Sequence, residues 1–379
     1  MDTTKASGDA AQKRAAQAGA ARLVRPELLA LLGYEPIEPV DVLAEELGIP
    51  PEQMLKLDGN ENPYGASPRV KDALADFDLY HIYPDPEQRR VREALADYVG
   101  VGAEHIVVGS GSDELLELIP RLFLSPGDTT VIPVPTFGVY SFATQVWGGR
   151  AVEVPRRQDF GLDLPALRAA SKGAKLVFLA SPNNPTGNPV SGEELEALLS
   201  TGALVVVDEA YAEFCDCSFV ELVPRRENLA VLRTFSKWAG LAGLRAGYGI
   251  FPAAVAELLR KVKMPYNVSV AAQLAMLASL EDTALLRERV GLIVRERERL
   301  SGALAAIPGL RPFPSEANFI LCRIETLDAR DVWQRLRRRG IFVRYFDEPM
   351  VRDCIRISVG RPEDSQRLLA ALREICLAG

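Results

Sequence analysis

The chain has 379 residues, of which 48% are hydrophobic, and this is enough to bury a large core in more than one domain. Its 44 basic and 51 acidic residues leave a formal net charge of −7, which argues against non-specific nucleic-acid binding. Only two histidines are present, so the sequence disfavours a histidine-rich metal site and a serine–histidine–aspartate triad, and we expect no metal.

The N-terminal region is alanine-rich and carries basic residues. Because it also contains Asp2 and Asp9 and no apolar stretch, we expect residues 1–30 to form a tail and a helical arm rather than a transit peptide. Apolar residues recur with helical spacing over 27–47, with a break at 33–39, and we assign 31–55 to the N-terminal part of a small domain. The following segment, KLDGNENPYG (56–65), is too rich in Gly, Asn and Pro for a regular element, which favours a functional role.

Short apolar runs alternate with helical stretches over about 85–250. The runs are 106–108, 130–132, 176–179, 204–207 and 230–232. Continuous hydrophobicity indicates strands that are buried on both faces, and the intervening helices predict a mainly parallel sheet between helices. We assign 56–268 to this large α/β domain.

The pattern changes after about residue 266. A long charged helix is expected over 281–304, followed by strands at 318–322, 341–344 and 354–358 and by a terminal helix. These elements predict a smaller α+β domain over 269–379. No run approaches the roughly 18 apolar residues that span a membrane.

The five cysteines are scattered and lack the spacing of a metal site; they are Cys215, Cys217, Cys322, Cys354 and Cys376. We interpret them as reduced packing residues, which is typical of a cytoplasmic protein.

The polar residues that follow the predicted strands carry the chemical information, because ligands bind at the carboxyl ends of strands in such sheets. GSGSDE (109–114) opens a helix, and its glycine-rich turn offers free N–H groups to a phosphate. The alternative is an ordinary capped helix in which Ser112 or Asp113 satisfies those donors. The sequence leaves both interpretations open.

Two further strands end in polar motifs. SPNNPTG (181–187) has two prolines around two asparagines, a pattern that fixes the backbone and directs an amide side chain into a site. In DEAY (208–211), Asp208 ends an apolar strand, where an unpaired carboxylate is costly to bury. A cation such as a protonated pyridine nitrogen would offset that cost, whereas the simpler alternative is a helix cap.

The segment TFSKWAGLAGLRAG (234–247) sets one lysine among hydroxyls, aromatic residues and glycines. A lysine in a desolvated site near another cation has a lowered pKa and can condense with an aldehyde. Lys237 is therefore the candidate nucleophile. The hydroxyls of Thr234 and Ser236, together with Arg245, could bind a dianion.

Taken together, SPNNPTG, DEAY and SK-x7-R resemble the fold-type I aminotransferases that depend on pyridoxal phosphate (PLP). Within that group the chain is similar to the histidinol-phosphate aminotransferases from about Tyr34 to the C-terminus. The motifs that carry this similarity are KLDGNENPYG (56–65), YPDP (83–86), RTFSK (233–237), KMPYN (263–267) and IRISVG (355–360).

The resemblance implies a seven-stranded sheet in the large domain and a set of PLP contacts. Lys237 would hold the cofactor covalently and shuttle the substrate Cα proton, and Asp208 would pair with the pyridine nitrogen. Tyr211 and Asn184 would hydrogen-bond the ring O3′, while Phe137, where many relatives have tyrosine, would stack on the ring. The cofactor phosphate would be held by the backbone amides of Ser112 and Asp113, by Ser236 and Arg245, and by Tyr83 from the second subunit of a homodimer.

The resemblance also implies a substrate site and a reaction. Arg356 would bind the substrate α-carboxylate, Tyr34 and Arg344 are candidates for the substrate phosphate, and Tyr266 and Asn267 would line the site from the interdomain hinge. The expected reaction transfers an amino group between glutamate and imidazole-acetol phosphate. Alternatives are an aromatic amino-acid aminotransferase, a PLP-dependent decarboxylase of a phosphorylated amino acid, and a non-catalytic PLP-binding regulator.

Overall fold

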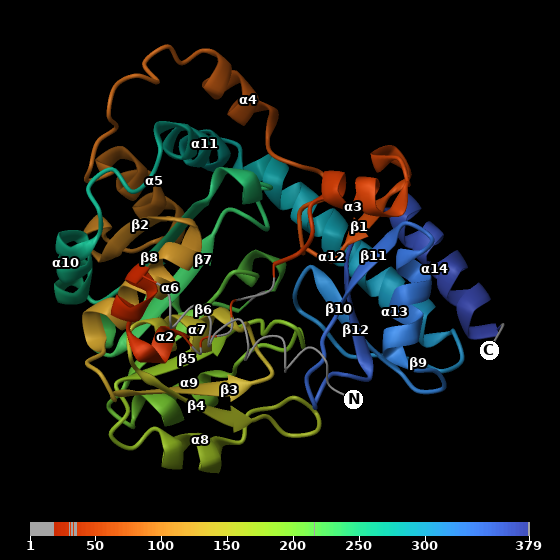
Figure 1. Cartoon of the computed structure of the whole chain (residues 1–379). Coiled ribbons are helices and arrows are strands. Elements are labelled where there is room, and N and C mark those ends of the chain that lie inside the picture. The colour runs from red at the N-terminus through yellow and green to blue at the C-terminus, as the bar shows by residue number, and fades with distance from the viewer. Residues whose placement is uncertain (1–18, 30, 32, 34–35, 216, 378–379) are drawn as a thin grey trace.

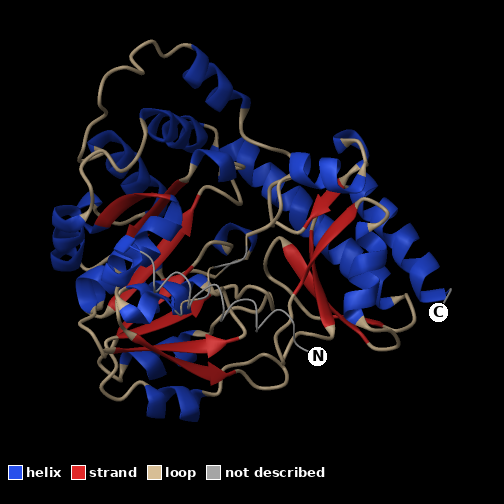
Figure 2. Cartoon of the chain, in the orientation of Figure 1, coloured by secondary structure: helices blue, strands red, loops and turns tan. Residues whose placement is uncertain are grey.

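The structure of the chain, a computed structural model, describes residues 19–29, 31, 33, 36–215 and 217–377. Two lobes lie side by side, and the C-terminal elements make up most of the smaller one (Figure 1). Each lobe is built on its own sheet, and the strands of the two sheets form separate groups in Figure 2.

The large lobe contains a seven-stranded sheet. In spatial order its strands are β2 (Ile106–Ser110), β8 (Ala246–Ile250), β7 (Leu229–Thr234), β6 (Leu204–Asp208), β5 (Leu176–Ala180), β3 (Thr129–Val134) and β4 (Arg150–Pro155). Strand β8 is antiparallel to both of its neighbours, and the other neighbouring pairs are parallel. The prediction of a mainly parallel seven-stranded sheet is confirmed. Strands β4 and β8 were not predicted individually, because neither is a continuous apolar run: β4 alternates in polarity and β8 contains two glycines.

Helices cover both faces of this sheet, which explains the continuous hydrophobicity of its strands. Val205 and Val207 pack into one apolar cluster, while Val206 between them packs into the cluster on the opposite face. The helices of the lobe are α4 (Pro68–Ala75), α5 (Arg89–Val99), α6 (Gly111–Phe123), α7 (Val139–Val146), α8 (Leu164–Ala170), α9 (Gly192–Leu199), α10 (Ala253–Val262) and α11 (Val270–Glu281).

The small lobe contains a five-stranded sheet. Its strands, in spatial order, are β1 (Leu55–Leu57), β11 (Ile341–Tyr345), β12 (Cys354–Ser358), β10 (Phe319–Ile324) and β9 (Leu310–Pro312). Helices α3 (Val40–Leu47), α13 (Ala329–Arg337) and α14 (Pro362–Leu377) belong to this lobe, and α12 (Thr283–Ala305) runs from α11 to its sheet (Figure 1). Strand β1 pairs with β11 and so crosses the boundary that we expected between residues 55 and 56.

Short elements complete the described chain. At the N-terminus, η1 (Gly19–Leu23) and α2 (Pro26–Leu29) form an arm, in which Arg25 donates a hydrogen bond to the Val146 carbonyl at the end of α7. The remaining 3-10 helices are η2 (Pro51–Gln53), η3 (Ala103–His105), η4 (Ala212–Phe214), η5 (Val220–Arg225) and η6 (Ala242–Leu244).

The expectation that all five cysteines are reduced is wrong. Cys215 and Cys217 are joined by a disulfide, which spans a loop between η4 and η5, whereas Cys322, Cys354 and Cys376 are free. A separation of two residues was too short to suggest pairing from the sequence. Within the described ranges, no group of three or more His, Cys, Asp or Glu residues is arranged to hold a metal, and no helix is long and apolar enough to cross a bilayer.

Candidate active site

The polar motifs converge at one edge of the large sheet. Strands β5, β6 and β7 are parallel, with Ala180 in register with Asp208 and Asp208 in register with Leu232. Their carboxyl ends therefore meet, and they bring together Asn184, which follows β5, and Lys237, which follows β7. These residues come from separate parts of the sequence, and the topology of the sheet places them in one site.

Asp208 is a buried carboxylate held by two donors. The Tyr140 hydroxyl donates to Oδ2 at 2.8 Å, and the Ala210 N–H donates to Oδ1 at 3.1 Å. Burial raises the pKa of Asp208 to about 6, although the Tyr140 hydrogen bond opposes that rise. Among the described residues, no Lys, Arg or His forms an ion pair with this carboxylate. The site therefore suits a cationic ring nitrogen.

Lys237 has the electrostatic environment of a nucleophilic amine. Its Nζ donates to the Gly59 carbonyl at 2.9 Å. Burial lowers the pKa of the lysine to about 8, and the nearby positive charge of Arg356 contributes to the shift. The neutral amine, which can attack an aldehyde, is therefore far more populated near neutral pH than that of an ordinary lysine. The lowered pKa that the sequence predicted is present.

The start of α6 forms a cradle for an anion. A side chain at Gly247 would place its Cβ 2.4 Å from the Ser112 nitrogen, so a glycine is required there for the two backbones to approach. Arg245 lies beside Gly111 and forms an ion pair with Asp113 at 2.5 Å. Both partners of this pair are about half exposed, at the rim of the cradle. The cradle combines helix N–H groups with an arginine, as a phosphate requires.

Ser236 lies after β7 with its hydroxyl oxygen 2.9 Å from the Thr234 hydroxyl oxygen. The Ser236 N–H donates to the same Thr234 oxygen at 3.1 Å, which fixes the turn between β7 and Lys237. Both hydroxyl residues are buried. The turn thus has the hydroxyl groups that were predicted to bind a dianion, although Thr234 is engaged in holding Ser236.

Arg356 lies on β12 of the small lobe and reaches toward the large lobe. Its Nη1 donates to Asn184 Oδ1 at 2.5 Å, and its Nη2 donates to the Asp58 carbonyl. Because a guanidinium has only donors, the Asn184 oxygen faces Arg356 and the amide nitrogen is directed to other acceptors. Arg356 and Asn184, which are 172 positions apart, therefore meet at the boundary between the lobes.

Arg344 and Arg356 are register partners on the antiparallel strands β11 and β12, so their side chains share one face of the small sheet. Both guanidinium groups lie over the ring of Phe346, at 5.7 Å for Arg344 and 5.6 Å for Arg356. This arrangement concentrates positive charge beside the predicted carboxylate site.

Tyr211 and Phe137 are the aromatic residues of the site. The Tyr211 hydroxyl accepts a hydrogen bond from Asn60 Nδ2 at 2.9 Å, and its ring packs edge-on against Phe319 with centroids 5.1 Å apart. Phe137 packs edge-on against Tyr140 at 5.7 Å, so Tyr140 contacts both the predicted stacking residue and Asp208. No role was predicted for Asn60 or Tyr140 from the sequence.

An ion-pair network holds the segment that carries Tyr211. Arg233 on β7 contacts Glu209 at 2.8 Å, Glu213 at 2.9 Å and the Ser218 hydroxyl at 2.8 Å. Arg233, Glu209 and Glu213 are buried, so each charge depends on the others for compensation. The network fixes both sides of Tyr211, which lies between the two glutamates.

Four predicted site residues remain, namely Tyr83, Tyr266, Asn267 and Tyr34. Tyr83 is 76% exposed and stacks on Tyr266 with ring centroids 4.4 Å apart. The Asn267 amide donates to the Val108 carbonyl at 3.1 Å and to Glu114 at 2.8 Å, so it braces the start of α6. The roles proposed for these residues stay predictions, and Tyr34 lies outside the described residues.

Comparison with known proteins assigns the chain to a class. The family model for aminotransferases of class I and II matches residues 52–372. This range includes every strand of both sheets and all but the end of the terminal helix α14. A crystal structure of histidinol-phosphate aminotransferase from Sinorhizobium meliloti, in complex with pyridoxal-5'-phosphate, superposes with a TM-score of 0.85 at 31% identity. That match covers 94% of this chain and 98% of the other. The fold is that of a fold-type I aminotransferase.

Curated relatives narrow the class further. A histidinol-phosphate aminotransferase from Roseiflexus castenholzii is 51% identical over 363 residues, covering 93% of this chain and 98% of that protein. A chloroplastic histidinol-phosphate aminotransferase from Arabidopsis thaliana is 44% identical over 355 residues, covering 93% of this chain and 85% of that protein. The chain belongs to the histidinol-phosphate aminotransferase family.

Proposed function

We propose that the chain uses PLP to transfer an amino group between glutamate and imidazole-acetol phosphate, giving 2-oxoglutarate and histidinol phosphate. The observation that carries the proposal is that Asp208 and Lys237 follow neighbouring strands at one edge of the large sheet, and that Arg356 reaches the same place from β12 of the small lobe. Relatives that are 44–51% identical over more than nine-tenths of the chain bear the name of this activity, which supports the choice of substrate.

The described residues fit PLP at each of its polar groups. Asp208, a buried carboxylate with a raised pKa, suits the pyridine nitrogen, and Lys237, an amine with a lowered pKa, suits the aldehyde carbon. The cradle at Ser112 and Arg245 suits the phosphate, because glycine lets the backbones approach there. When bound, PLP supplies an electron-withdrawing ring that stabilises negative charge at the substrate Cα.

The protein side chains would bind the substrate and move its proton. Arg356 would exchange its contact with the Asp58 carbonyl for a bidentate contact with the substrate carboxylate. Lys237, once the substrate amine has replaced it on the cofactor, would carry the proton from the substrate Cα to C4′ of the cofactor. Arg344, on the same face of the small sheet as Arg356, would attract the substrate phosphate.

The proposal includes a homodimer in the cytoplasm. Exposed apolar residues gather in two segments, 79–83 and 264–266, which meet where Tyr83 stacks on Tyr266. They include Leu79, Tyr80, Ile82 and Met264. A second copy of the chain would cover them, and the partner subunit's Tyr83 would then reach the cofactor phosphate. Sedimentation of the wild type against Tyr80→Asp and Ile82→Asp variants tests this part.

A comparison of amino acceptors tests the proposed reaction. The purified protein is loaded with PLP and glutamate, and kcat/KM is measured for imidazole-acetol phosphate and for phenylpyruvate. We expect the phosphorylated acceptor to be preferred by at least roughly tenfold, equivalent to about 1.4 kcal/mol, because it brings an anion toward Arg344. Arg344→Gln should reduce that preference. Equal or greater activity with phenylpyruvate would instead identify an aromatic aminotransferase, and release of carbon dioxide without an acceptor would identify a decarboxylase.

A further inference from the structure

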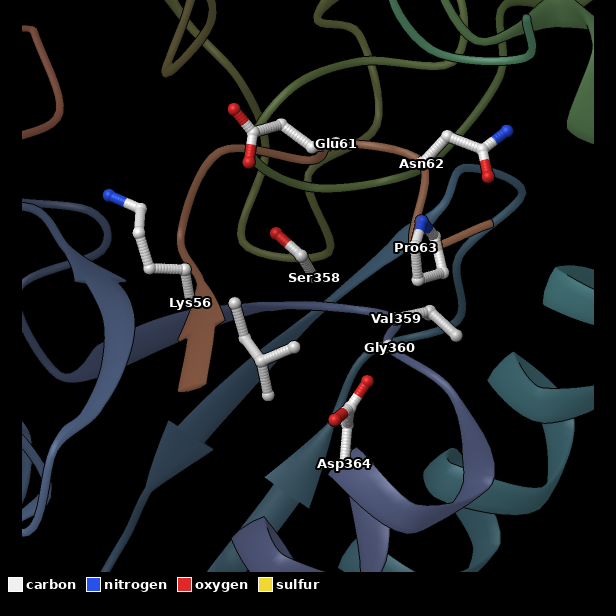
Figure 3. A pocket seen from close by; sticks show the side chains of 9 residues that line it. Lys56, Glu61, Asn62, Pro63, Ser358, Val359, Gly360 and Asp364 are labelled. Carbon is white, nitrogen blue, oxygen red and sulfur yellow. The ribbon is translucent and has the colours of Figure 1, made fainter. Parts of the chain in front are cut away.

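Asn60 is buried, 1% exposed, in the loop that joins the small-lobe strand β1 to the large lobe. Its φ of 52° lies in the left-handed region, which asparagine tolerates better than most residues do. The hydroxyl of Ser358 lies within the bend that this loop makes between Lys56 and Pro63, beside a pocket of about 200 Å³ (Figure 3).

Each polar group of Asn60 is engaged in the structure. Its N–H donates to Ser358 Oγ at 2.8 Å, and its carbonyl accepts from Asn318 Nδ2 at 2.9 Å. In the side chain, Oδ1 accepts from the Ser358 hydroxyl at 2.9 Å and Nδ2 donates to the Tyr211 oxygen at 2.9 Å. The contacts of Asn60 therefore connect the small lobe with Tyr211 of the large lobe.

The direction of these hydrogen bonds follows from the chemistry of the groups. Because the Asn60 N–H can only donate, the Ser358 oxygen accepts there and its hydrogen is available for Asn60 Oδ1. That contact fixes the amide so that its NH₂ group faces Tyr211. The Tyr211 oxygen must then accept, and the Tyr211 hydrogen is directed toward another acceptor.

We propose that Asn60 is a positioning residue that makes Tyr211 a hydrogen-bond donor to the cofactor. This inference rests on the proposed function, in which Tyr211 contacts the anionic O3′ of PLP. An accepted hydrogen bond strengthens the one that the same hydroxyl donates, so Asn60 stabilises the O3′ anion through Tyr211. Ser358 lies on β12 of the small lobe, as Arg356 does. Its contact with Asn60 therefore forms only when the small lobe is packed against the large one.

The test is the pH dependence of the visible absorption that PLP shows when bound to Lys237. Stabilising the O3′ anion lowers the pKa of this chromophore, so Asn60→Gly, which accepts the positive φ, should raise that pKa by about one unit. Ser358→Ala, which removes the group that orients the amide, should change it in the same direction. Asn228→Gly removes a partly buried amide at the opposite end of β7 and should leave the chromophore unchanged.

A double-mutant cycle separates the proposed relay from a general structural effect. In a Tyr211→Phe background, Asn60→Gly and Ser358→Ala should no longer change the chromophore pKa, because there is no hydroxyl to orient. Equal shifts with and without the Tyr211 hydroxyl, or no shift with it, would overturn the proposal. Ser358→Ala gives the same test if Asn60→Gly fails to fold. If the wild-type protein takes up no PLP, the proposed function fails first, and this inference falls with it.

Discussion

Asp208→Asn should make the cofactor-free protein more stable while impairing its function. The substitution keeps the shape of the side chain and removes its charge. The amide oxygen can accept from the Ala210 N–H and the amide nitrogen can donate to the Tyr140 oxygen, whereas the Tyr140 hydrogen loses Asp208 as its acceptor, so the gain in stability is an upper limit. The main favourable change is the loss of a carboxylate that lies in the buried site without a cationic partner among the described residues.

The size of the effect follows from the pKa of Asp208. Burial raises it from 3.8 to about 6, which corresponds to about 3 kcal/mol because each tenfold change in proton affinity is worth about 1.4 kcal/mol. Since the pKa is higher in the folded state, ionisation opposes folding. The penalty is absent below pH 3.8, grows as the pH rises, and is complete above about pH 6.

Urea unfolding of the cofactor-free protein, at a fixed protein concentration, measures this penalty. At pH 8 the free energy of unfolding of the variant should exceed that of the wild type by up to about 3 kcal/mol, and the difference should fall to about half near pH 5. Asp97→Asn, at an exposed position on α5, is the control and should change stability by less than about 0.5 kcal/mol. A cofactor-free variant that is no more stable than the wild type at pH 8 would refute the reasoning.

Three further outcomes are expected. The rate at which cofactor-free protein takes up PLP, followed by absorption, should rise with pH through about 8 as Lys237 loses its proton, and a flat profile would contradict this account. Arg356→Lys should raise the KM for glutamate by roughly 10- to 100-fold in steady-state assays, because an ammonium cannot replace the bidentate contact; an unchanged KM would exclude that contact. Arg233→Met leaves Glu209 and Glu213 buried without their partner and should lower the free energy of unfolding by about 3–5 kcal/mol, whereas a neutral effect in urea denaturation would show that the ion pairs do not hold this segment.

The sequence predicted those parts of the fold that have a strong periodic signal. Five apolar runs became β2, β3, β5, β6 and β7, since strands buried on both faces leave no polar positions. The same criterion missed β8, in which Gly247 lets the backbone at Ser112 approach and Gly249 leaves room for the Phe251 ring, so the strand lacks hydrophobic bulk. Strand β1 was missed because three residues give no recognisable period, and its pairing with β11 lies far along the chain.

The candidate site was predicted where its residues lie in recognisable motifs after strands. Lys237, Asp208 and Asn184 meet because parallel strands end at one edge of the sheet, which the alternation of strands and helices already implied. Tyr140 could not be found in this way, because it lies on a helix and its neighbours in the sequence do not reveal its contact with Asp208. Asn60 was in a segment that the sequence marked as functional, but its role depends on Ser358, 298 positions away.

Two backbone oxygens, those of Asp58 and Gly59, receive the hydrogen bonds of Arg356 and Lys237. No substitution of a side chain can delete these acceptors. Mutations at positions 58 and 59 should therefore leave the positions of Arg356 and Lys237 unchanged, provided that the loop backbone keeps its conformation. An arriving carboxylate competes with an oxygen that is already present, and its affinity reflects the difference between two acceptors and not the full strength of one. A ligand without a formal negative charge would gain little free energy by replacing these carbonyl oxygens. The backbone of the loop therefore helps the site to discriminate against such ligands.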